Sequence, residues 1–375
     1  MDEEGVCQPR HQLVLTRRKL VYMKVGLVLG AGGVLGGAWL TGGLAAIADE
    51  TGWDPGSADY IVGTSAGSVI GALVASGVPP WFMVAHSAGE SFDGLSDVDG
   101  NPASTASRSG GAVFKLHRGL PSIGPGSLRL GLAAMRRPMM YTPAAAFGAW
   151  LPVGLISTEA IRDVIRRVVP QGWTDHPNTW IVACDYGTGR RVPFGRPGAP
   201  DADMPDAVAA SCAIPGFYHP VTVGGHRYVD GGMYSASNLD LLATAGLDLV
   251  ICLNPTSTLV PSTARNPFDR VADAVRKTAG RRLGYEARKV RAQGTEVVLI
   301  QPVADDLALM GRNLMRRKGR HDVIEMARRT VAEQIHEGDA SGTLGALPAG
   351  EPHKIARRSG DPAGWPPMGP AERAA

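Results

Sequence analysis

The stretch of sequence that decides the fold reads Tyr60-Ile61-Val62-Gly63-Thr64-Ser65-Ala66-Gly67-Ser68. A short apolar run comes first, and the residues that follow as far as Ala75 favour a helix. This order predicts a strand, a sharp turn and a helix, with Ser65 at the turn of a G-x-S-x-G pattern. Gly63 and Gly67 let the chain double back, so that the serine hydroxyl projects from the turn and faces the positive end of the helix. A serine held in this way is placed to act as a nucleophile.

The pattern on both sides of this stretch predicts the fold class. An apolar run, Val25–Leu29, precedes it, and a helix is expected over Gly37–Asp49. Apolar runs bounded by glycine are typical of strands buried in a parallel sheet. The order of strand, glycine-rich loop, helix, strand, turn and helix therefore predicts an α/β protein, with a central, mostly parallel sheet covered by helices on both faces. Further strands are expected at Trp180–Cys184, Leu249–Leu253 and Glu296–Ile300, and further helices after an N-cap at Ser157, from Asn266-Pro267 and over Asp322–Ile335.

The ordered pattern extends from Met23 to His336, which we interpret as one domain. Residues 1–22 and 337–375 are polar or rich in Gly, Ala and Pro, and are predicted to be disordered tails. A Gly-, Pro- and Met-rich insertion at about 89–152 interrupts the domain. Two interpretations of it stay open. It is either an irregular insertion that packs its own leucines on the domain, or a cap whose apolar side chains face a lipid, with Arg136 and Arg137 near the headgroups.

The charge and the cysteine content of the chain limit the binding partners and the cellular compartment that we expect. A net charge of +3 over 375 residues gives no global electrostatic case for nucleic acid, so no nucleic-acid partner is expected. The region from Arg276 to Arg329 is locally basic, which indicates either a solvated helix face or peripheral contact with an anionic membrane. The four cysteines lack the spacing of a zinc site or a disulfide framework, which favours a reducing, cytoplasmic location. They are Cys7, Cys184, Cys212 and Cys252.

A charge-free stretch, Val25–Ala48, is long enough to suggest a membrane span. Eight glycines interrupt it, which indicates a loop approached closely by other backbone rather than a lipid-facing helix. Arg17-Arg18-Lys19 imitates the charged start of a signal peptide, but the apolar part that follows is too long and too broken by glycine for one.

The loop from Gly30 to Gly36 is the candidate anion-binding element, because it joins the first strand to the first helix. The backbone N–H groups of Gly32, Gly33 and Val34 are expected to form a nest at the start of that helix. Nucleotide binding is the rival use of such a loop. The glycine spacing misses the dinucleotide fingerprint by one place, and the next strand ends in the serine turn rather than in an acidic ribose partner.

A serine nucleophile needs a base, and Asp230 is the preferred candidate. An extended segment delivers this carboxylate into Gly231 and Gly232, which permit close backbone approach. Taken alone, Asp-Gly-Gly is also a common surface turn. The runner-up is an α/β-hydrolase triad, in which a histidine would follow the acid. Its candidates are His321, His336 and His353, none of which lies near a predicted strand end.

The glycine-rich loop, the serine turn and the Asp-Gly-Gly motif, in this order, resemble the patatin-like phospholipase family. The similarity spans about Val25 to Gln301, and two flanking stretches support it, Ala210–Phe217 and Ala183-Cys184-Asp185. The resemblance implies a three-layer α/β/α fold, a Ser65–Asp230 dyad, and an acyl-enzyme formed from a fatty-acyl ester of a phospholipid, a lysophospholipid or a neutral glyceride. It implies no metal and no organic cofactor. The motif glycines that support the site are Gly30, Gly36, Gly63, Gly67, Gly231 and Gly232.

The sequence departs from the family pattern in the glycine-rich loop. Ala31 replaces a glycine, and Leu35 stands where the family usually has a cation. Without that cation, charge-assisted stabilisation beside the loop is lost and the headgroup preference stays open. A non-catalytic lipid-binding protein that keeps the fold is the remaining alternative.

Overall fold

The computed structural model describes residues 23–88, 113–118, 124–258, 260, 267–337 and 341–349. The predicted N-terminal tail, the first part of the predicted insertion, Asn266 and most of the predicted C-terminal tail lie outside these residues.

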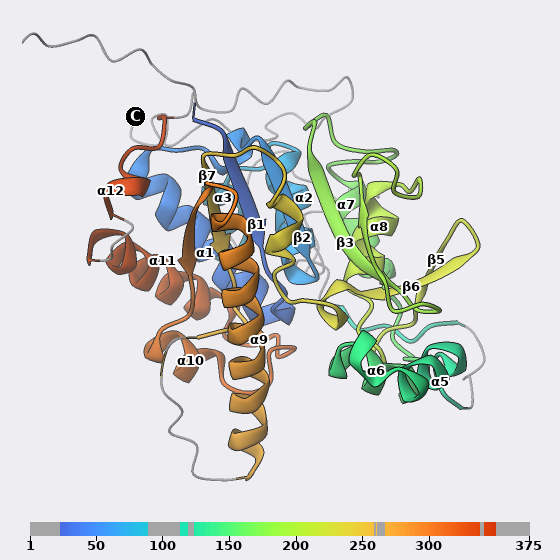
Figure 1. Ribbon diagram of the computed structural model, residues 1–375. Helices are drawn as coiled ribbons and strands as arrows, with labels where there is room; N and C mark the ends of the chain where they lie inside the picture. Colours follow the sequence, from blue (N-terminus) through green and yellow to red (C-terminus); the bar gives the residue numbers. More distant parts are fainter. Residues whose placement is uncertain are drawn as a thin grey trace, which may run out of the picture.

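A sheet of eight strands forms the middle layer of the molecule (Figure 1). The strand order is β5-β6-β3-β2-β1-β7-β8, with β4 beside β3. The five strands from β3 to β8 in this order pair in parallel, whereas β4, β5 and β6 pair antiparallel. The strands are β1 (Val25–Leu29), β2 (Tyr60–Thr64), β3 (Thr179–Asp185), β4 (Arg191–Phe194), β5 (Val221–Val223), β6 (His226–Asp230), β7 (Leu249–Leu253) and β8 (Glu296–Ile300).

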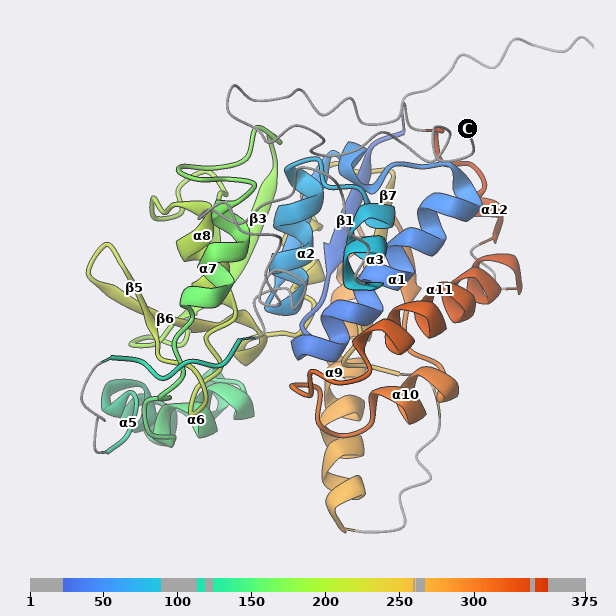
Figure 2. The same ribbon diagram turned by 180° about the vertical axis from the view of Figure 1, so that it is seen from behind.

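Helices cover both faces of this sheet, which confirms the predicted fold class. One face carries α1 (Gly33–Thr51), α2 (Ala66–Ala75), α3 (Pro80–Ala88), α7 (Glu159–Arg166), α8 (Met204–Ser211) and α11 (Arg320–Glu337), seen in front in Figure 2. The other face carries α9 (Pro267–Arg291) and the short helix η4 (Leu239–Leu242). Alternate residues of each strand point to opposite faces, so each central strand contributes to two apolar layers.

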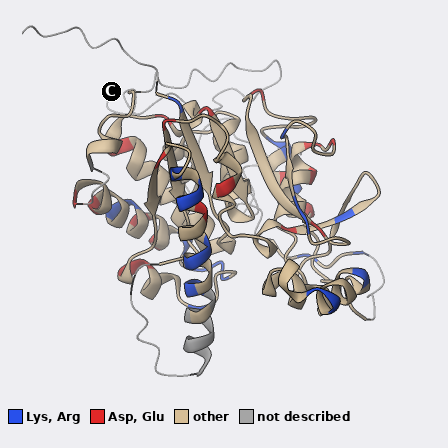
Figure 3. Ribbon diagram, in the orientation of Figure 1, with Lys and Arg blue, Asp and Glu red and all other residues tan. Residues whose placement is uncertain are grey.

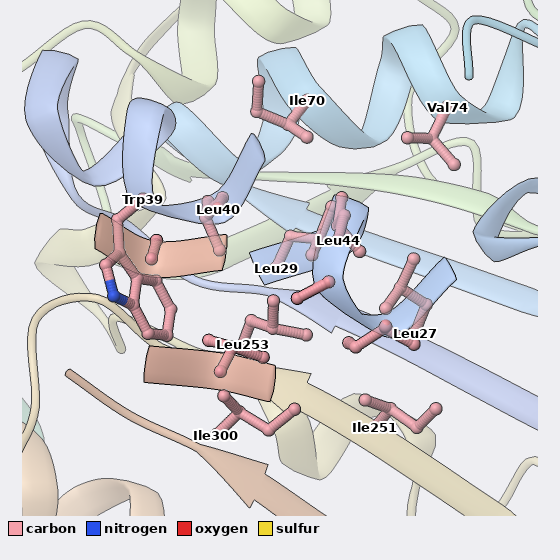
Figure 4. Close-up of a cluster of buried hydrophobic side chains, with 14 of the residues drawn as sticks. Leu27, Leu29, Trp39, Leu40, Leu44, Ile70, Val74, Ile251, Leu253 and Ile300 are labelled. Carbon is pink, nitrogen blue, oxygen red and sulfur yellow. The ribbon is translucent and has the colours of Figure 1, made fainter. Parts of the chain in front are cut away.

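The largest apolar cluster lies between the sheet and α1 (Figure 4). Leu27, Leu29 and Leu253 from the strands meet Trp39 and Leu44 from the helix. α1 also packs closely on α11, because Gly42 of α1 has no side chain at the contact. A Cβ built on Gly42 would lie 2.2 Å from the carbonyl oxygen of Ile324.

Most of residues 128–150 in the predicted insertion form helices. α5 (Leu128–Arg136), the short helix η2 (Pro138–Met140) and α6 (Pro143–Trp150) lie together at one corner, beside the hairpin of β5 and β6 (Figures 1 and 2). Leu130 of α5 is buried on the body, whereas Leu128 and Leu132 are exposed. The remaining elements are η1 (Pro55–Ser57), η3 (Gly231–Met233), α10 (Ala304–Met310) and α12 (Ser341–Leu344).

Several elements differ from the sequence prediction in where they begin or end. α1 begins at Gly33 rather than Gly37, because the N–H groups of Leu35 and Gly36 find acceptors despite the low helix propensity of glycine. The N-cap of α7 is Thr158 rather than Ser157. Within the C-terminal segment predicted to be disordered, residues 341–349 are described and contain α12; Leu344 of this helix and Leu347 after it are buried in the main core.

Among the described residues, no single helix has both the length and the apolar character needed to cross a membrane. α2 and α3 reach that length and composition together, but the chain bends by 119° between them.

Candidate active site

Ser65 occupies the sharp turn between β2 and α2, in a backbone conformation that few residues adopt. Its φ is 54° and its ψ is −122°, and only one other described non-glycine residue, Asn238, has a positive φ. Such a conformation costs on the order of 1–3 kcal/mol and persists only where the surroundings hold it. Here the Ser65 N–H donates to Ser211 Oγ at 2.9 Å, and that hydroxyl donates to the carbonyl of Val182 at 2.6 Å. The serine turn is thus fixed to β3.

The two glycines of the serine turn are required by close packing. A Cβ built on Gly63 would lie 2.6 Å from Ser68 Cα, and one built on Gly67 would lie 2.0 Å from the carbonyl oxygen of Leu29. Both contacts are with backbone, which cannot move aside easily. The glycines therefore let α2 fold back directly over β1 and β2, and this aims its N-terminal end at Ser65.

The sheet brings the Asp-Gly-Gly motif to the serine turn. β4 pairs with residues 181–184 along one edge of β3. β2 and β6 must therefore pair along the other edge, where β2 covers residues 179–182 and β6 covers residues 183–185. β2 ends with Thr64 opposite Val182, and β6 ends with Asp230 opposite Ala183. The ends of these two strands therefore meet, which places the residue after Thr64 beside the carboxylate.

Asp230 and Ser65 are both buried, at 5% and 4% exposure, and the Ser65 side chain is close enough to influence the pKa of the Asp230 carboxyl. Burial raises the pKa of the Asp230 carboxyl from 3.8 to about 6, although the nearby Ser65 hydroxyl and a hydrogen bond from the Gly232 N–H act to lower it. The Gly232 bond is 2.7 Å long. Because a base is most effective when its pKa lies near the working pH, this environment suits a general base better than an exposed carboxylate would.

The two glycines after Asp230 pack against the rest of the site, so the motif is not a surface turn. A Cβ on Gly231 would lie 2.2 Å from the carbonyl oxygen of Val182. A Cβ on Gly232 would lie 3.6 Å from the Cβ of Ala31 in the glycine-rich loop. The carboxylate is thus held between β3 and the start of α1.

Three backbone N–H groups of the glycine-rich loop are available to an oxyanion. The N–H of Gly30 donates to Leu253 O, that of Ala31 to Ala236 O, that of Leu35 to Leu314 O and that of Gly36 to Gly32 O. In the part of the chain that the structure describes, no acceptor is found for the N–H groups of Gly32, Gly33 and Val34. These are the three predicted from the sequence, and they lie at the positive end of α1.

The supporting glycines of this loop again mark close contacts. A Cβ on Gly30 would lie 2.5 Å from Asn254 Oδ1, and one on Gly36 would lie 3.2 Å from Pro255 Cγ. The loop is therefore pressed against the segment that follows β7, which keeps its N–H groups in place.

Leu35, at the place where the family pattern has a cation, is a core residue. Its side chain is fully buried in the cluster between α1 and the sheet. A charged side chain at this position would be desolvated without a partner in that cluster, which explains why an apolar residue fits here.

The histidines of the alternative triad lie elsewhere. His336 contacts Glu50 Oε2 at 2.7 Å, near the C-terminal end of α1. The nest lies at the other end of that 19-residue helix, about 25 Å away at 1.5 Å per residue. His321 is exposed on α11, and His353 lies outside the described residues.

Sequence reasoning missed two residues that hold the site together. Ser211 stands in a family-like stretch of the sequence, but its role as the acceptor for the Ser65 N–H depends on tertiary packing. Leu314 caps the start of α1 through its carbonyl oxygen, for which the sequence carries no signal.

Chemically, this arrangement joins a hydroxyl, a buried carboxylate of raised pKa and a set of preorganised N–H donors, which are the parts that acyl transfer requires. The family model for patatin-like phospholipases matches residues 27–243, more than half of the chain. The matched segment includes the glycine-rich loop, Ser65 and Asp230. The chain therefore belongs to the patatin-like phospholipase family.

Proposed function

We propose that this protein is a serine acyl hydrolase that cleaves fatty-acyl esters of lipids through Ser65 and Asp230. Family membership supports a lipid acyl hydrolase in general. The observation that carries the finer proposal is the meeting of β2 and β6 along β3, which brings Ser65, held in the strained turn, beside the buried Asp230 carboxylate. The substrate classes proposed are phospholipids, lysophospholipids and neutral glycerides.

In the proposed reaction, Asp230 accepts the proton of the Ser65 hydroxyl as its oxygen attacks the ester carbonyl carbon. The N–H groups of Gly32, Gly33 and Val34 stabilise the negative charge that develops on the carbonyl oxygen. Asp230 then returns the proton to the departing alcohol, which leaves a fatty-acyl ester on Ser65. A water molecule, deprotonated by Asp230, releases the fatty acid and restores the serine.

We further propose that the protein works in the cytoplasm, with peripheral contact to an anionic membrane. Three cysteines in the described part of the chain are free and buried, as expected for a protein of a reducing compartment. A lipid ester within a bilayer can be reached only at the membrane surface, which supports peripheral contact.

The proposal is tested with a fluorophosphonate probe, which labels an activated serine covalently. Wild-type protein should be labelled, and Ser65→Ala and Asp230→Asn should not. A panel of phospholipid, lysophospholipid and glyceride esters then identifies the substrate class. Wild-type protein that binds lipid yet resists the probe would support the non-catalytic alternative.

The histidine alternative is separated by a second set of variants. Alanine at His321, His336 or His353 should leave labelling and ester hydrolysis at wild-type rates, because no step of the proposed reaction uses an imidazole. Loss of activity in any of these variants, with Asp230→Asn still active, would favour a Ser-Asp-His triad.

A further inference from the structure

One corner of the molecule carries nearly all the large apolar side chains that the described residues expose. Ten such side chains are exposed in the described part of the chain, and all but Tyr285 lie between Leu116 and Leu155. The nine are Leu116, Leu128, Leu132, Met135, Met139, Met140, Phe147, Trp150 and Leu155, and we call them the apolar face. Exposed apolar side chains concentrated in one segment in this way indicate an interaction site.

α5 and α6 place their large side chains outward and mostly small ones inward, which reverses the usual order. On α5 the exposed residues Leu128, Leu132 and Met135 recur once per turn, whereas Gly131 and Ala134 are buried. A helix that only covers a protein core turns its large apolar residues toward that core.

α6 repeats this arrangement. Phe147 is 69% exposed and Trp150 is 42% exposed, whereas Ala145, Gly148 and Ala149 are buried. Between the two helices, Met139 is 97% exposed. The outward side chains of both helices and of the turn between them therefore form one apolar surface.

The charged side chains of the inserted helices are all positive. The sequence contains no Asp or Glu between Asp99 and Glu159. Arg129, Arg136 and Arg137 are exposed on α5 and directly after it, and Figure 3 shows blue and no red along α5 and α6. Apolar side chains bordered by arginine are typical of helices that lie in the interface of an anionic bilayer.

A second copy of the chain fits this surface less well than a lipid does. In a two-fold symmetric dimer the same patch lies on both sides of the interface. Each arginine would then face a surface that offers arginines and no carboxylates, which opposes association.

The apolar face is tied to the segment that carries Asp230. Thr142, the N-cap of α6, donates a hydrogen bond to the carbonyl of Met233, three residues after Asp230. A Cβ on Gly148 would lie 2.6 Å from the Met233 methyl carbon, so α6 rests directly on η3. The Tyr186 hydroxyl adds a hydrogen bond of 2.9 Å to the Gly148 carbonyl.

We propose that the apolar face, together with Arg129, Arg136 and Arg137, is the surface through which this protein docks on an anionic lipid bilayer. The inference deepens the proposed function and rests on it, because it names the surface that brings the Ser65 site to its lipids. α5 and α6 lie in the plane of the interface, with Phe147 and Trp150 at the boundary between headgroups and acyl chains and the arginines on anionic headgroups. This assigns membrane contact to the inserted helices rather than to the basic helix α9.

The test is sedimentation of the full chain with vesicles of phosphatidylcholine, alone or with about 30 mol % phosphatidylserine. The Ser65→Ala background is used so that hydrolysis does not alter the vesicles. Two triple variants probe the surface, Leu132→Glu/Met135→Glu/Phe147→Glu and Arg129→Gln/Arg136→Gln/Arg137→Gln. Their matched controls lie on α9 and are Tyr285→Glu and Lys277→Gln/Arg281→Gln/Arg288→Gln, all at exposed positions.

The unmodified face should bind the phosphatidylserine vesicles, and the glutamate triple should abolish this binding. The arginine triple should weaken it on the order of 100-fold, at about fivefold for each charge removed. Both α9 controls should bind as the parent does. Far-ultraviolet circular dichroism and the unfolding midpoint of each variant show whether it is folded, and the arginine triple changes no apolar contact.

Several results would overturn the proposal. One is a parent protein that does not sediment with either vesicle; another is binding that the α9 triple removes and the glutamate triple leaves intact. A dimer that the glutamate triple dissociates, without vesicle binding, would assign the face to a second copy instead. Failure of the proposed function has a different signature, because wild-type protein would then resist the fluorophosphonate probe whether or not it binds vesicles.

Discussion

At the scale of single residues, the environment of Asp230 predicts the pH dependence of catalysis. The carboxyl must be ionised to accept the proton of Ser65, and its pKa is raised to about 6 by burial. We therefore expect the rate of acylation by a water-soluble short-chain ester to be low below this pKa and to rise with pH through about 6. Single-turnover kinetics across this range measure the inflection. An inflection that persists in Asp230→Asn would assign it to another group.

Ser211 is expected to position the nucleophile rather than to touch substrate. Replacing it with alanine removes the acceptor of the Ser65 N–H and the donor to the Val182 carbonyl. We expect Ser211→Ala to lower kcat about tenfold while KM changes little, because a displaced turn misaligns the attacking oxygen. Ser76→Ala is the matched control, since its hydroxyl donates to Ala72 O at the other end of α2. Equal kinetic effects of the two substitutions would contradict a specific role for Ser211.

At the scale of helices and strands, the contact of α1 with α11 predicts opposite effects of one substitution at two glycines. A methyl group at Gly42 would meet the Ile324 carbonyl oxygen, whereas one at Gly37 would lie 3.7 Å from the Cβ of Ala66, an ordinary contact. Gly42→Ala should therefore lower the free energy of unfolding by about 1–3 kcal/mol. Gly37→Ala should raise it by about 0.5–1 kcal/mol, because alanine favours the helix. Denaturant unfolding of both variants measures the difference, and a shared sign would show that α11 can move away.

The same scale shows which elements the sequence predicts well. β1, β2 and β7 are continuous apolar runs, so their positions and burial follow directly from the pattern. The first turn of α1 could not be predicted in this way. Its glycines predict a loop, and its helical form depends on the Leu314 carbonyl, which is far away in the sequence. The local sequence also does not predict that β6 pairs on the edge of β3 that β2 occupies, because this pairing depends on the arrangement of the whole sheet. The sequence could therefore propose Ser65 and Asp230 as partners only through the order of the motifs.

The inserted helices show another limit of sequence pattern. α5 and α6 carry their large apolar residues outward, so a method that assigns apolar residues to a core places them inside. Only Leu130 among the leucines of α5 follows that rule. The sequence alone cannot decide whether the insertion packs its leucines on the domain or presents them to a lipid. That decision needs the exposed fraction of each side chain.

At the scale of the whole molecule, the buried Asp230 opposes stability at the pH where the proposed reaction needs its carboxyl ionised. A carboxyl whose pKa is 3.8 in the unfolded chain and about 6 in the folded one binds its proton more tightly when folded. Its contribution therefore turns unfavourable as pH rises through this window, by up to about 3 kcal/mol above it. Asp230→Asn should stabilise the fold at about pH 8 and have little effect below about pH 4. Denaturant unfolding at the two pH values measures this, and a stabilisation independent of pH would contradict it.

The end-to-end meeting of β2 and β6 along β3 also has a consequence for folding during synthesis. A ribosome releases the serine turn early, within the first parallel strands, but the carboxylate arrives only after the antiparallel hairpin has been made and has found its edge. Until then the nascent polypeptide holds a nucleophile with no base. If the proposed function holds, the onset of ester hydrolysis during refolding would therefore report the pairing of β6 with β3.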